Sequence, residues 1–207
     1  MDLQTFHSEV SKAIARGTAY DARIPAYGRM AARYIERNYT FQYMNVMSTF
    51  DIDADAVEPR LITLPQRMKK DTLIRIVLSD GSYQALQKID PQQQHDLITE
   101  VPSGYFLSGD DRIWLAQTPQ EDYPAEIFYT RFTTWPTAAD GTNWLLTNAE
   151  DVLIAQTMVY MAPLLRDPDA ATLWGGMLSM CMKSLLDADY ELEFSNKPAV
   201  MQYGVAS

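Results

Sequence analysis

The middle of the chain, roughly Glu58 to Thr134, is rich in β-forming residues and separates two helical stretches. Neither helical stretch has enough apolar residues to close a core alone, so we expect the two to pack on each other. The expected fold class is α+β, with a bundle of N- and C-terminal helices and an inserted antiparallel β-rich subdomain, either a small sandwich or a curled sheet. The expected divisions are 1–57 for the N-terminal helices, 58–134 for the insertion, 135–194 for the return segment and C-terminal helices, and 195–207 for a C-terminal arm.

The charge balance limits the partners that the chain can have. Twenty-seven acidic and seventeen basic side chains give a formal net charge of -10. This excess of carboxylates argues against a surface that binds DNA by neutralising its phosphates. The acidity either keeps the protein soluble or forms a negative wall along which DNA passes without sticking.

The remaining composition excludes several other classes of protein. Cys181 is the only cysteine, so an intramolecular disulfide is impossible, and its Met and Leu neighbours indicate a packing role. We expect no signal peptide and no membrane span, because the start lacks a basic and then apolar pattern and apolar runs stay below eighteen residues. We therefore expect no membrane partner.

Two helices are expected before the β-rich segment. The first carries Leu3, Phe6, Val10 and Ile14 at helical spacing and ends near Gly17. The second is expected to run from about Ile24 to Phe50 with a broad apolar surface. Its exposed face is expected to carry four charged residues that are either solvated or form a contact between subunits: Arg29, Arg33, Glu36 and Arg37.

Two more helices are expected after the β-rich segment. Asn148 is expected to cap a helix that begins near Ala149 and that Pro163 kinks or ends. Pro168 favours the first turn of a last helix, whose packed seam is expected to be Leu173, Met177, Cys181, Leu185 and Ala188. The acidic residues near its end oppose the helix dipole, which indicates a solvated end, a basic partner or a rim that repels DNA: Asp187, Asp189, Glu191 and Glu193.

About six strands are expected in the middle of the chain. They occupy residues 61–64, 73–78, 83–89, 105–107, 113–115 and 126–132, with turns at Asp80-Gly81 and at 108–111, and a short helical or irregular link at 90–95. Trp135 and Trp144 then follow in the return to helix. Two tryptophans so close together are expected to pin the insertion onto the helical core.

Several runs of residues resemble one family. These are residues 34–41 (YIERNYTF), 104–107 (GYFL), 113–119 (IWLAQTP), and the return from Tyr129 through Trp135-Pro136 to residues 143–146 (NWLL). They resemble the head-to-tail adaptor proteins of tailed bacteriophages, which are portal-attached connector or head-completion proteins, and specifically the podovirus type. The similarity extends over most of the chain, and its motifs are packing signatures rather than catalytic ones.

The resemblance implies a structural virion protein of the phage neck, made in the host cytoplasm and located at the head–tail interface. Such a protein binds the portal, forms a dodecameric ring with copies of itself, extends the DNA channel and carries tail, nozzle or tail-fibre proteins. DNA passes through during ejection without specific binding, and no cofactor is implied. The strand-compatible C-terminal arm is expected to dock on the portal through Val200, Met201, Tyr203 and Val205.

The alternatives to a non-enzymatic adaptor are weaker. A cell-wall hydrolase associated with the virion tail needs two carboxylates across a cleft, and the pairs Glu36 with Glu58 or Glu100 with Asp122 have no distinguishing context. Only two histidines exist, His7 and His95, which leaves little for a metal site or a Ser-His-Asp triad. A DNA-binding regulator needs a basic recognition helix free of core aromatics, unlike residues 24–37.

Overall fold

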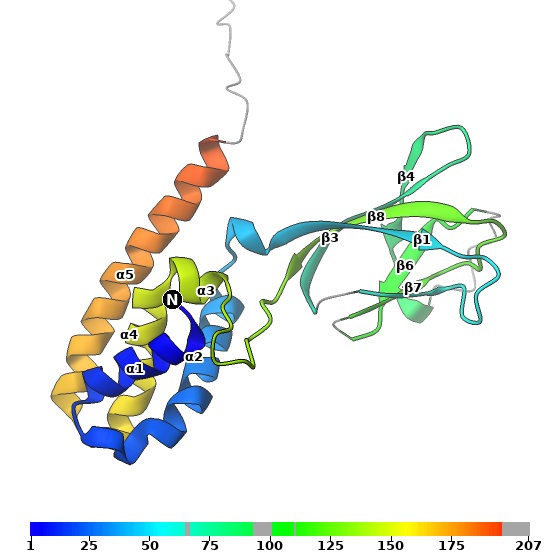
Figure 1. Ribbon diagram of the computed structural model, residues 1–207. Coiled ribbons are helices and arrows are strands. Elements are labelled where there is room, and N and C mark those ends of the chain that lie inside the picture. The colour runs from blue at the N-terminus through cyan, green and yellow to red at the C-terminus, as the bar shows by residue number, and fades with distance from the viewer. Residues whose placement is uncertain (65–66, 93–100, 110, 196–207) are drawn as a thin grey trace, which may run out of the picture. The chain divides into compact units, whose positions relative to one another are not determined.

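The computed structural model describes residues 1–64, 67–92, 101–109 and 111–195 of the 207-residue chain. The protein is α+β, and its chain divides into two compact units. The first unit comprises Met1–Gln42 and Trp135–Ser207, and the second comprises Tyr43–Thr134. In Figure 1 the helical unit contains ribbons from both ends of the chain, drawn in blue and in yellow to orange, and the β unit is drawn in cyan and green.

The first helix, α1 (Leu3–Ile14), is the amphipathic helix that the sequence predicts. It buries Leu3, Phe6, Val10 and Ile14 on one face. The Asp2 carboxylate accepts a hydrogen bond from the Thr5 backbone N–H at 2.7 Å and caps the helix start. The helix ends at Ala15, which has a left-handed backbone with φ of 52°, and a 3₁₀ turn (η1, Gly17–Arg23) leads to the next helix.

The prediction of one helix from Ile24 to Phe50 is wrong in its second half. Helix α2 covers Ile24–Asn38, a short 3₁₀ turn (η2) covers Gln42–Met44, and Asn45–Ile52 is strand β1. Residues 45–52 are rich in β-branched and aromatic side chains, and their burial alternates along the chain. Strand β1 pairs antiparallel with β8 over its full length, so tertiary pairing overrides the apolar spacing that suggested a helix.

The C-terminal half of the helical unit begins with a helix that the sequence did not indicate. Helix α3 (Trp144–Asn148) is capped by Asn143, whose side chain accepts from the Leu146 N–H at 3.0 Å. Asn148 therefore ends α3 and does not cap the next helix, since its own amide donates back to the Trp144 carbonyl at 3.2 Å. Helix α4 (Glu150–Leu165) starts at Ala149 without a side-chain cap.

Helix α4 is the centre of the helical unit. It has buried residues all around its axis, including Val152, Leu153, Thr157 and Met161. Pro163 does not end the helix, which continues to Leu165 and closes at Arg166 with φ of 53°. Pro163 has no N–H to donate to the carbonyl of residue 159, so one helical hydrogen bond is lost, and only two helical residues follow it.

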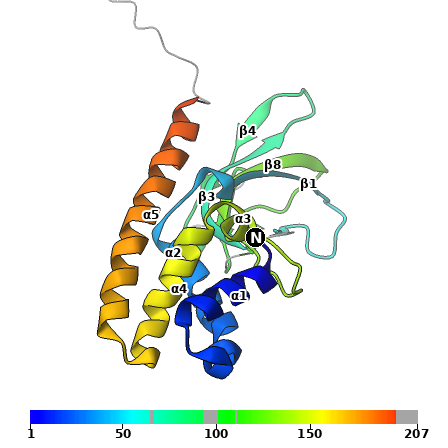
Figure 2. The same cartoon turned by 60° about the vertical axis from the view of Figure 1, so that its left-hand side comes forward.

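The last helix, α5 (Pro168–Ser195), is 28 residues long and starts with the proline that the sequence placed there. The Asp167 carboxylate accepts from the Ala170 N–H at 2.9 Å at its start. Helix α4 has 16 residues, so at 1.5 Å per residue α5 is about 18 Å longer. The two helices lie side by side, and α5 extends past the end of α4 (Figures 1 and 2).

The β unit contains two four-stranded sheets in its described residues. The first has the order β1-β8-β3-β4, with β3 at Met68–Val77, β4 at Tyr83–Ala85 and β8 at Tyr123–Arg131. The second has the order β2-β7-β6-β5, with β2 at Leu61–Thr63, β5 at Gln87–Lys88, β6 at Gly104–Leu107 and β7 at Arg112–Leu115. All pairings are antiparallel except β5 with β6, so the second sheet is mixed.

Both expected hairpins are confirmed. The β3–β4 turn contains Gly81 with φ of 81°, and the β6–β7 turn contains Gly109 with φ of 85°. The strand expected at 83–89 is instead two strands that belong to different sheets, joined through the buried Leu86. Both sheets contribute to one apolar core, which includes Ile74, Ile113 and Ile127.

Candidate functional site

The outward face of α2 carries three of the four residues proposed as a subunit contact. Arg29, Arg33 and Arg37 are exposed. Glu36 is not on this face: it is only 3% exposed, lies one turn after the buried Ala32, and has an interaction partner. The i, i+4 spacing places Glu36 with the inward-facing residues, which corrects the sequence-based assignment. The basic face of α2 is defined here as Arg29, Arg33 and Arg37.

The outward face of α5 is apolar for about two turns. Leu173 is 61% exposed and Met180 is 69% exposed, and Met177 lies between them at helical spacing. Acidic side chains flank these residues on the same helix, with Asp169 at its start and Asp187 and Glu191 toward its end, all exposed. We call this set, Asp169, Leu173, Met177, Met180, Asp187 and Glu191, the outer stripe of α5.

The outer stripe corrects the expected packing seam of the last helix. Leu173, Met177 and Ala188 were expected to be buried and are exposed. Among the side chains of α5 whose burial the structure describes, Met182 is the most buried, at 6% exposure, so a neighbouring face of the helix packs against α4. Apolar residues occur on two faces of α5, so their spacing does not show which of the two faces packs against α4. The rotation of α5 about its own axis decides this.

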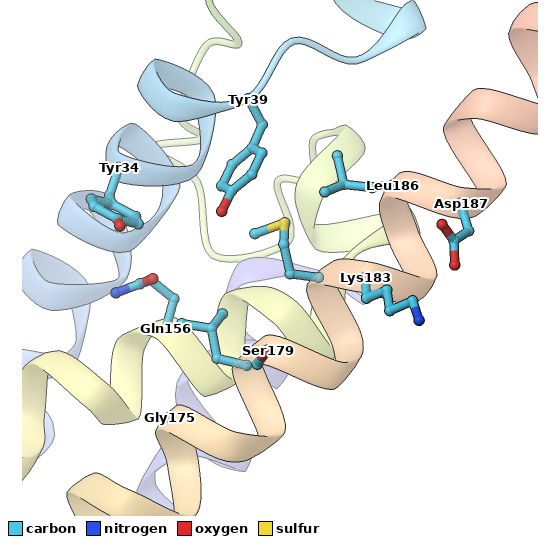
Figure 3. Close-up of a pocket in the computed structure, with 10 residues that line it drawn as sticks. Tyr34, Tyr39, Gln156, Gly175, Ser179, Lys183, Leu186 and Asp187 are labelled. Carbon is cyan, nitrogen blue, oxygen red and sulfur yellow. The ribbon is translucent and has the colours of Figure 1, made fainter.

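A groove of about 420 Å³ lies between α2, α4 and α5 (Figure 3). Gln156 of α4 forms part of its lining and is only 3% exposed. Its amide has no hydrogen-bond partner among the described residues, although it can both donate and accept. The complete lining consists of Tyr34, Tyr39, Gln156, Gly175, Leu178, Ser179, Met182, Lys183, Leu186 and Asp187.

The wall of the groove on the α2 side is held by an aromatic pair. The ring of Tyr34 meets Tyr160 of α4 edge to face, with 6.0 Å between ring centroids and an interplanar angle of 85°. Burial, with a smaller contribution from Tyr34, raises the pKa of Tyr160, and Arg37 partly opposes this. The phenol therefore remains protonated and neutral over the physiological pH range.

One acidic residue near the end of α5 has a structural role. The Asp189 carboxylate accepts hydrogen bonds from the Gln42 backbone N–H at 2.9 and 3.2 Å. This charge-assisted contact ties the segment after α2 to α5 and offsets the unfavourable position of a carboxylate near a helix C-terminus. The exposed Asp187 and Glu191 have no such contact among the described residues.

Two side chains that often take part in catalysis, Cys181 and His7, have shifted pKa values. Burial, together with the nearby Asp151, raises the pKa of the Cys181 thiol, which disfavours the nucleophilic thiolate. Burial lowers the pKa of His7. The described residues contain no group of three or more His, Cys, Asp or Glu side chains placed to hold a metal ion.

The comparison with known families identifies the chain. Residues 1–200 match the family described as SU10 adaptor protein. This chain belongs to that family. The SU10 adaptor family places it among bacteriophage adaptors, which are structural virion components that interact with portal and tail components. No curated protein matches the chain.

The two tryptophans of this SU10 adaptor family member both contact aromatic rings of the helical unit. Trp135 meets Phe6 edge to face with centroids 6.2 Å apart, and Trp144 is tilted against Phe41 at 5.4 Å. The return segment is therefore attached to α1 and to the residues after α2. The four residues proposed to bind the portal, Val200, Met201, Tyr203 and Val205, lie outside the described residues.

The carboxylates considered for a hydrolase include three described residues, Glu36, Glu58 and Asp122. Glu36 is buried in the helical unit, whereas Glu58 belongs to the β unit. Asp122 accepts a hydrogen bond from the Ala54 backbone N–H at 2.9 Å, and Glu100 lies outside the described residues. In the part of the chain that the structure describes, no helix has the length and apolar character that crossing a membrane requires.

Proposed function

We propose that this protein is the adaptor ring of a podovirus-type phage neck. It attaches beneath the portal, assembles with copies of itself into a dodecamer, extends the DNA channel and provides the platform for tail, nozzle or tail-fibre proteins. The observation that carries the proposal is the family match, which extends over residues 1–200 and therefore includes both units. It acts by geometry, without a reaction step or a cofactor.

The charge of the chain supports a conduit rather than a DNA-binding surface. A net charge of -10 disfavours the phosphate contacts that hold DNA on a protein. Packaged DNA must move through the neck during ejection, so a wall that does not bind phosphates is an advantage. The portal acts as the template for assembly, because many weak contacts around one ring raise the effective concentration of neighbouring copies.

The C-terminal arm is the proposed portal contact. Met201, Tyr203 and Val205 alternate with the polar or small residues 202, 204 and 206, a strand-compatible pattern that Val200 precedes. Such a segment can add a strand to an exposed sheet edge of a partner, with backbone hydrogen bonds giving affinity.

Cleavage of peptidoglycan is the competing function.

The deciding experiment mixes the purified protein with its portal and measures the mass of the complex. We expect a shift from subunit mass to a ring-sized portal complex. Absence of any shift, or release of soluble fragments from purified cell wall without portal, would contradict the adaptor function. Isolated virions should contain the chain in stoichiometric amount relative to the portal.

A truncation tests the proposed arm separately. Removal of residues 196–207 should abolish portal attachment while leaving the circular dichroism spectrum of the folded units unchanged. A full-length variant with Val200, Met201, Tyr203 and Val205 all replaced by Ser tests whether the apolar side chains, rather than the length, matter. If the truncated protein attaches as well as the native one, the arm is not the portal contact.

A further inference from the structure

We propose that the outer stripe of α5 on one copy docks against the basic face of α2 on the neighbouring copy. This inference rests on the proposed ring and names the two surfaces that build it. The contact joins two different faces of the molecule. Each copy therefore contacts one neighbour through its outer stripe and the other neighbour through its basic face. Repetition of such a contact closes a ring when a whole number of the rotations between neighbouring copies makes one full turn.

The outer stripe has the character of a covered surface. Leu173 and Met180 are more than half exposed, and Met177 connects them along one face of the helix. An isolated exposed apolar residue is ordinary, but contiguous apolar residues with a polar border are typical of an interaction site. The border here is acidic, because Asp169 precedes the apolar residues and Asp187 and Glu191 follow them.

The charges of the basic face of α2 complement those of the stripe. Arg33 and Arg37 are exposed, and neither forms an ion pair with the residues that the structure describes. They are four residues apart, as are Asp187 and Glu191 on α5, so the two pairs have the same spacing of one helical turn. Met30, which is 52% exposed, lies beside the arginines and provides an apolar contact for the stripe.

A second copy fits these surfaces better than DNA does. Phosphates would be repelled by Asp187 and Glu191, while the same carboxylates attract the arginines of a neighbour. Lys183 is the basic side chain on this stretch of α5; it lines the groove together with Asp187 and also lies beside Met180 and Glu191 of the stripe, where two carboxylates outnumber it. Arginine at an interface can make two parallel hydrogen bonds to a carboxylate, which fixes the register of the contact.

Charge reversal on each face tests the proposal. One variant carries Arg33→Glu and Arg37→Glu, and the other carries Asp187→Lys and Glu191→Lys. Each protein alone is mixed with portal, and we expect at least a tenfold loss of ring-sized complex because like charges then face each other. Glu58→Lys with Glu121→Lys is the matched control for the second variant, since both raise the net charge by the same amount and the control does so at exposed positions of the β unit.

The mixture of the two variants is the decisive measurement. In an alternating ring, every contact between the two variants again joins opposite charges, so we expect the mixture to recover most of the native amount of complex. Normal assembly of either variant alone would overturn the proposal. Loss without recovery in the mixture would also overturn it, because the faces would then serve the portal or the fold rather than each other.

The native protein separates this inference from the proposed function. If native protein fails to form a ring-sized portal complex, the adaptor function fails, and the inference that rests on it fails with it. If native protein and both variants assemble equally well, the adaptor function stands and the assigned surfaces are wrong. Circular dichroism spectra and melting temperatures of all variants establish that each remains folded.

Discussion

Tyr105, Asp71 and Lys88 form a polar link between the two sheets of the β unit. The Tyr105 hydroxyl donates to one oxygen of Asp71, and the Lys88 ammonium donates to the other at 2.9 Å. Burial raises the pKa of Asp71, but the hydrogen bonds from Tyr105 and Lys88 outweigh it and hold the pKa below the ordinary value of 3.8. The carboxylate therefore stays ionised and depends on both donors.

Replacement of Tyr105 by Phe should destabilise the β unit by about 1.5–3 kcal/mol. The substitution removes a hydrogen bond to a charged, largely buried acceptor, which costs more than a bond between neutral groups. Tyr83→Phe is the matched control, because Tyr83 is 57% exposed, and it should change stability by less than about 0.5 kcal/mol. Urea unfolding of both variants measures the difference, and equal stabilities would show that the Tyr105 hydroxyl contributes nothing.

His7 should make stability depend on pH. Burial lowers its pKa below the ordinary value of 6.5, and its Nε2 has no hydrogen-bond partner among the described residues. The unfolded chain then binds more protons than the folded one as the pH falls below about 6.5, so protonation of His7 favours unfolding. Stability should decrease through this range as the pH falls.

The variant His7→Leu isolates the effect. The free energy of unfolding of the native protein, minus that of the variant, should fall between about pH 7.5 and about pH 5. His95, the other histidine, is present in both proteins and cancels in the difference. A difference that does not change with pH would mean that His7 titrates normally in the folded state.

At the scale of elements, the packing of α1 on α2 depends on a glycine. A Cβ at Gly28 would lie 2.6 Å from Cε1 of Phe6, and Phe6 is fully buried against Trp135. Because Phe6 is fully buried, its ring would have to shift against its neighbours to admit a Cβ, so Gly28 allows the two helices to approach closely. Glycine is normally unfavourable inside a helix, but this close contact requires it at position 28.

Substitution of Gly28 by Ala should therefore lower stability. Overpacking of this kind costs about 1–3 kcal/mol, which exceeds the roughly 1 kcal/mol that Ala gains over Gly in a helix. Gly176→Ala in α5 is the control, because nothing lies within 4 Å of an added Cβ. That variant should be more stable than the native protein by about 0.5–1 kcal/mol. Thermal unfolding measures both, and opposite signs are the expected result.

The elements that the sequence predicted correctly are those with local signals. Helix α1 has an unambiguous apolar stripe, α5 begins at Pro168, and the two hairpins turn at Gly81 and Gly109. The errors occur where tertiary pairing decides. Residues 45–52 have apolar spacing compatible with a helix, but β8 offers a full set of backbone partners.

At the scale of the whole molecule, each unit has its own core. Among the described residues, the buried apolar core of the β unit runs from Ile52 to Tyr129, with Val46 and Phe50 packed against it, whereas α1, α2 and α4 bury residues against one another in the helical unit. Residues 43–134 expressed alone should therefore unfold cooperatively and give a β-type circular dichroism spectrum. Residues 1–42 alone should remain unfolded, because their apolar faces need α4. A non-cooperative transition for 43–134 would show that the helical unit is required for its stability.

The candidate surfaces were only partly predictable. The exposure of Arg29, Arg33 and Arg37 follows from helical spacing, but the burial of Glu36 and the exposure of Leu173 do not. The groove was not predicted, since Gln156 lies in a helix that is apolar on all sides and gives no sign of lining a cavity. The family was predictable because its motifs are local runs of residues, and residues 1–200 carry the match.

The sequence by itself determined the α+β class, the helix and hairpin starts with local capping or turn chemistry, and the family. These features depend mainly on residues close together in the sequence, whose local signals agree with the tertiary structure at these positions. Only the tertiary structure decided where α2 gives way to β1, which face of α5 remains exposed, and that Gln156 lines a groove. Those outcomes depend on backbone partners and packing surfaces contributed by residues far away in the chain.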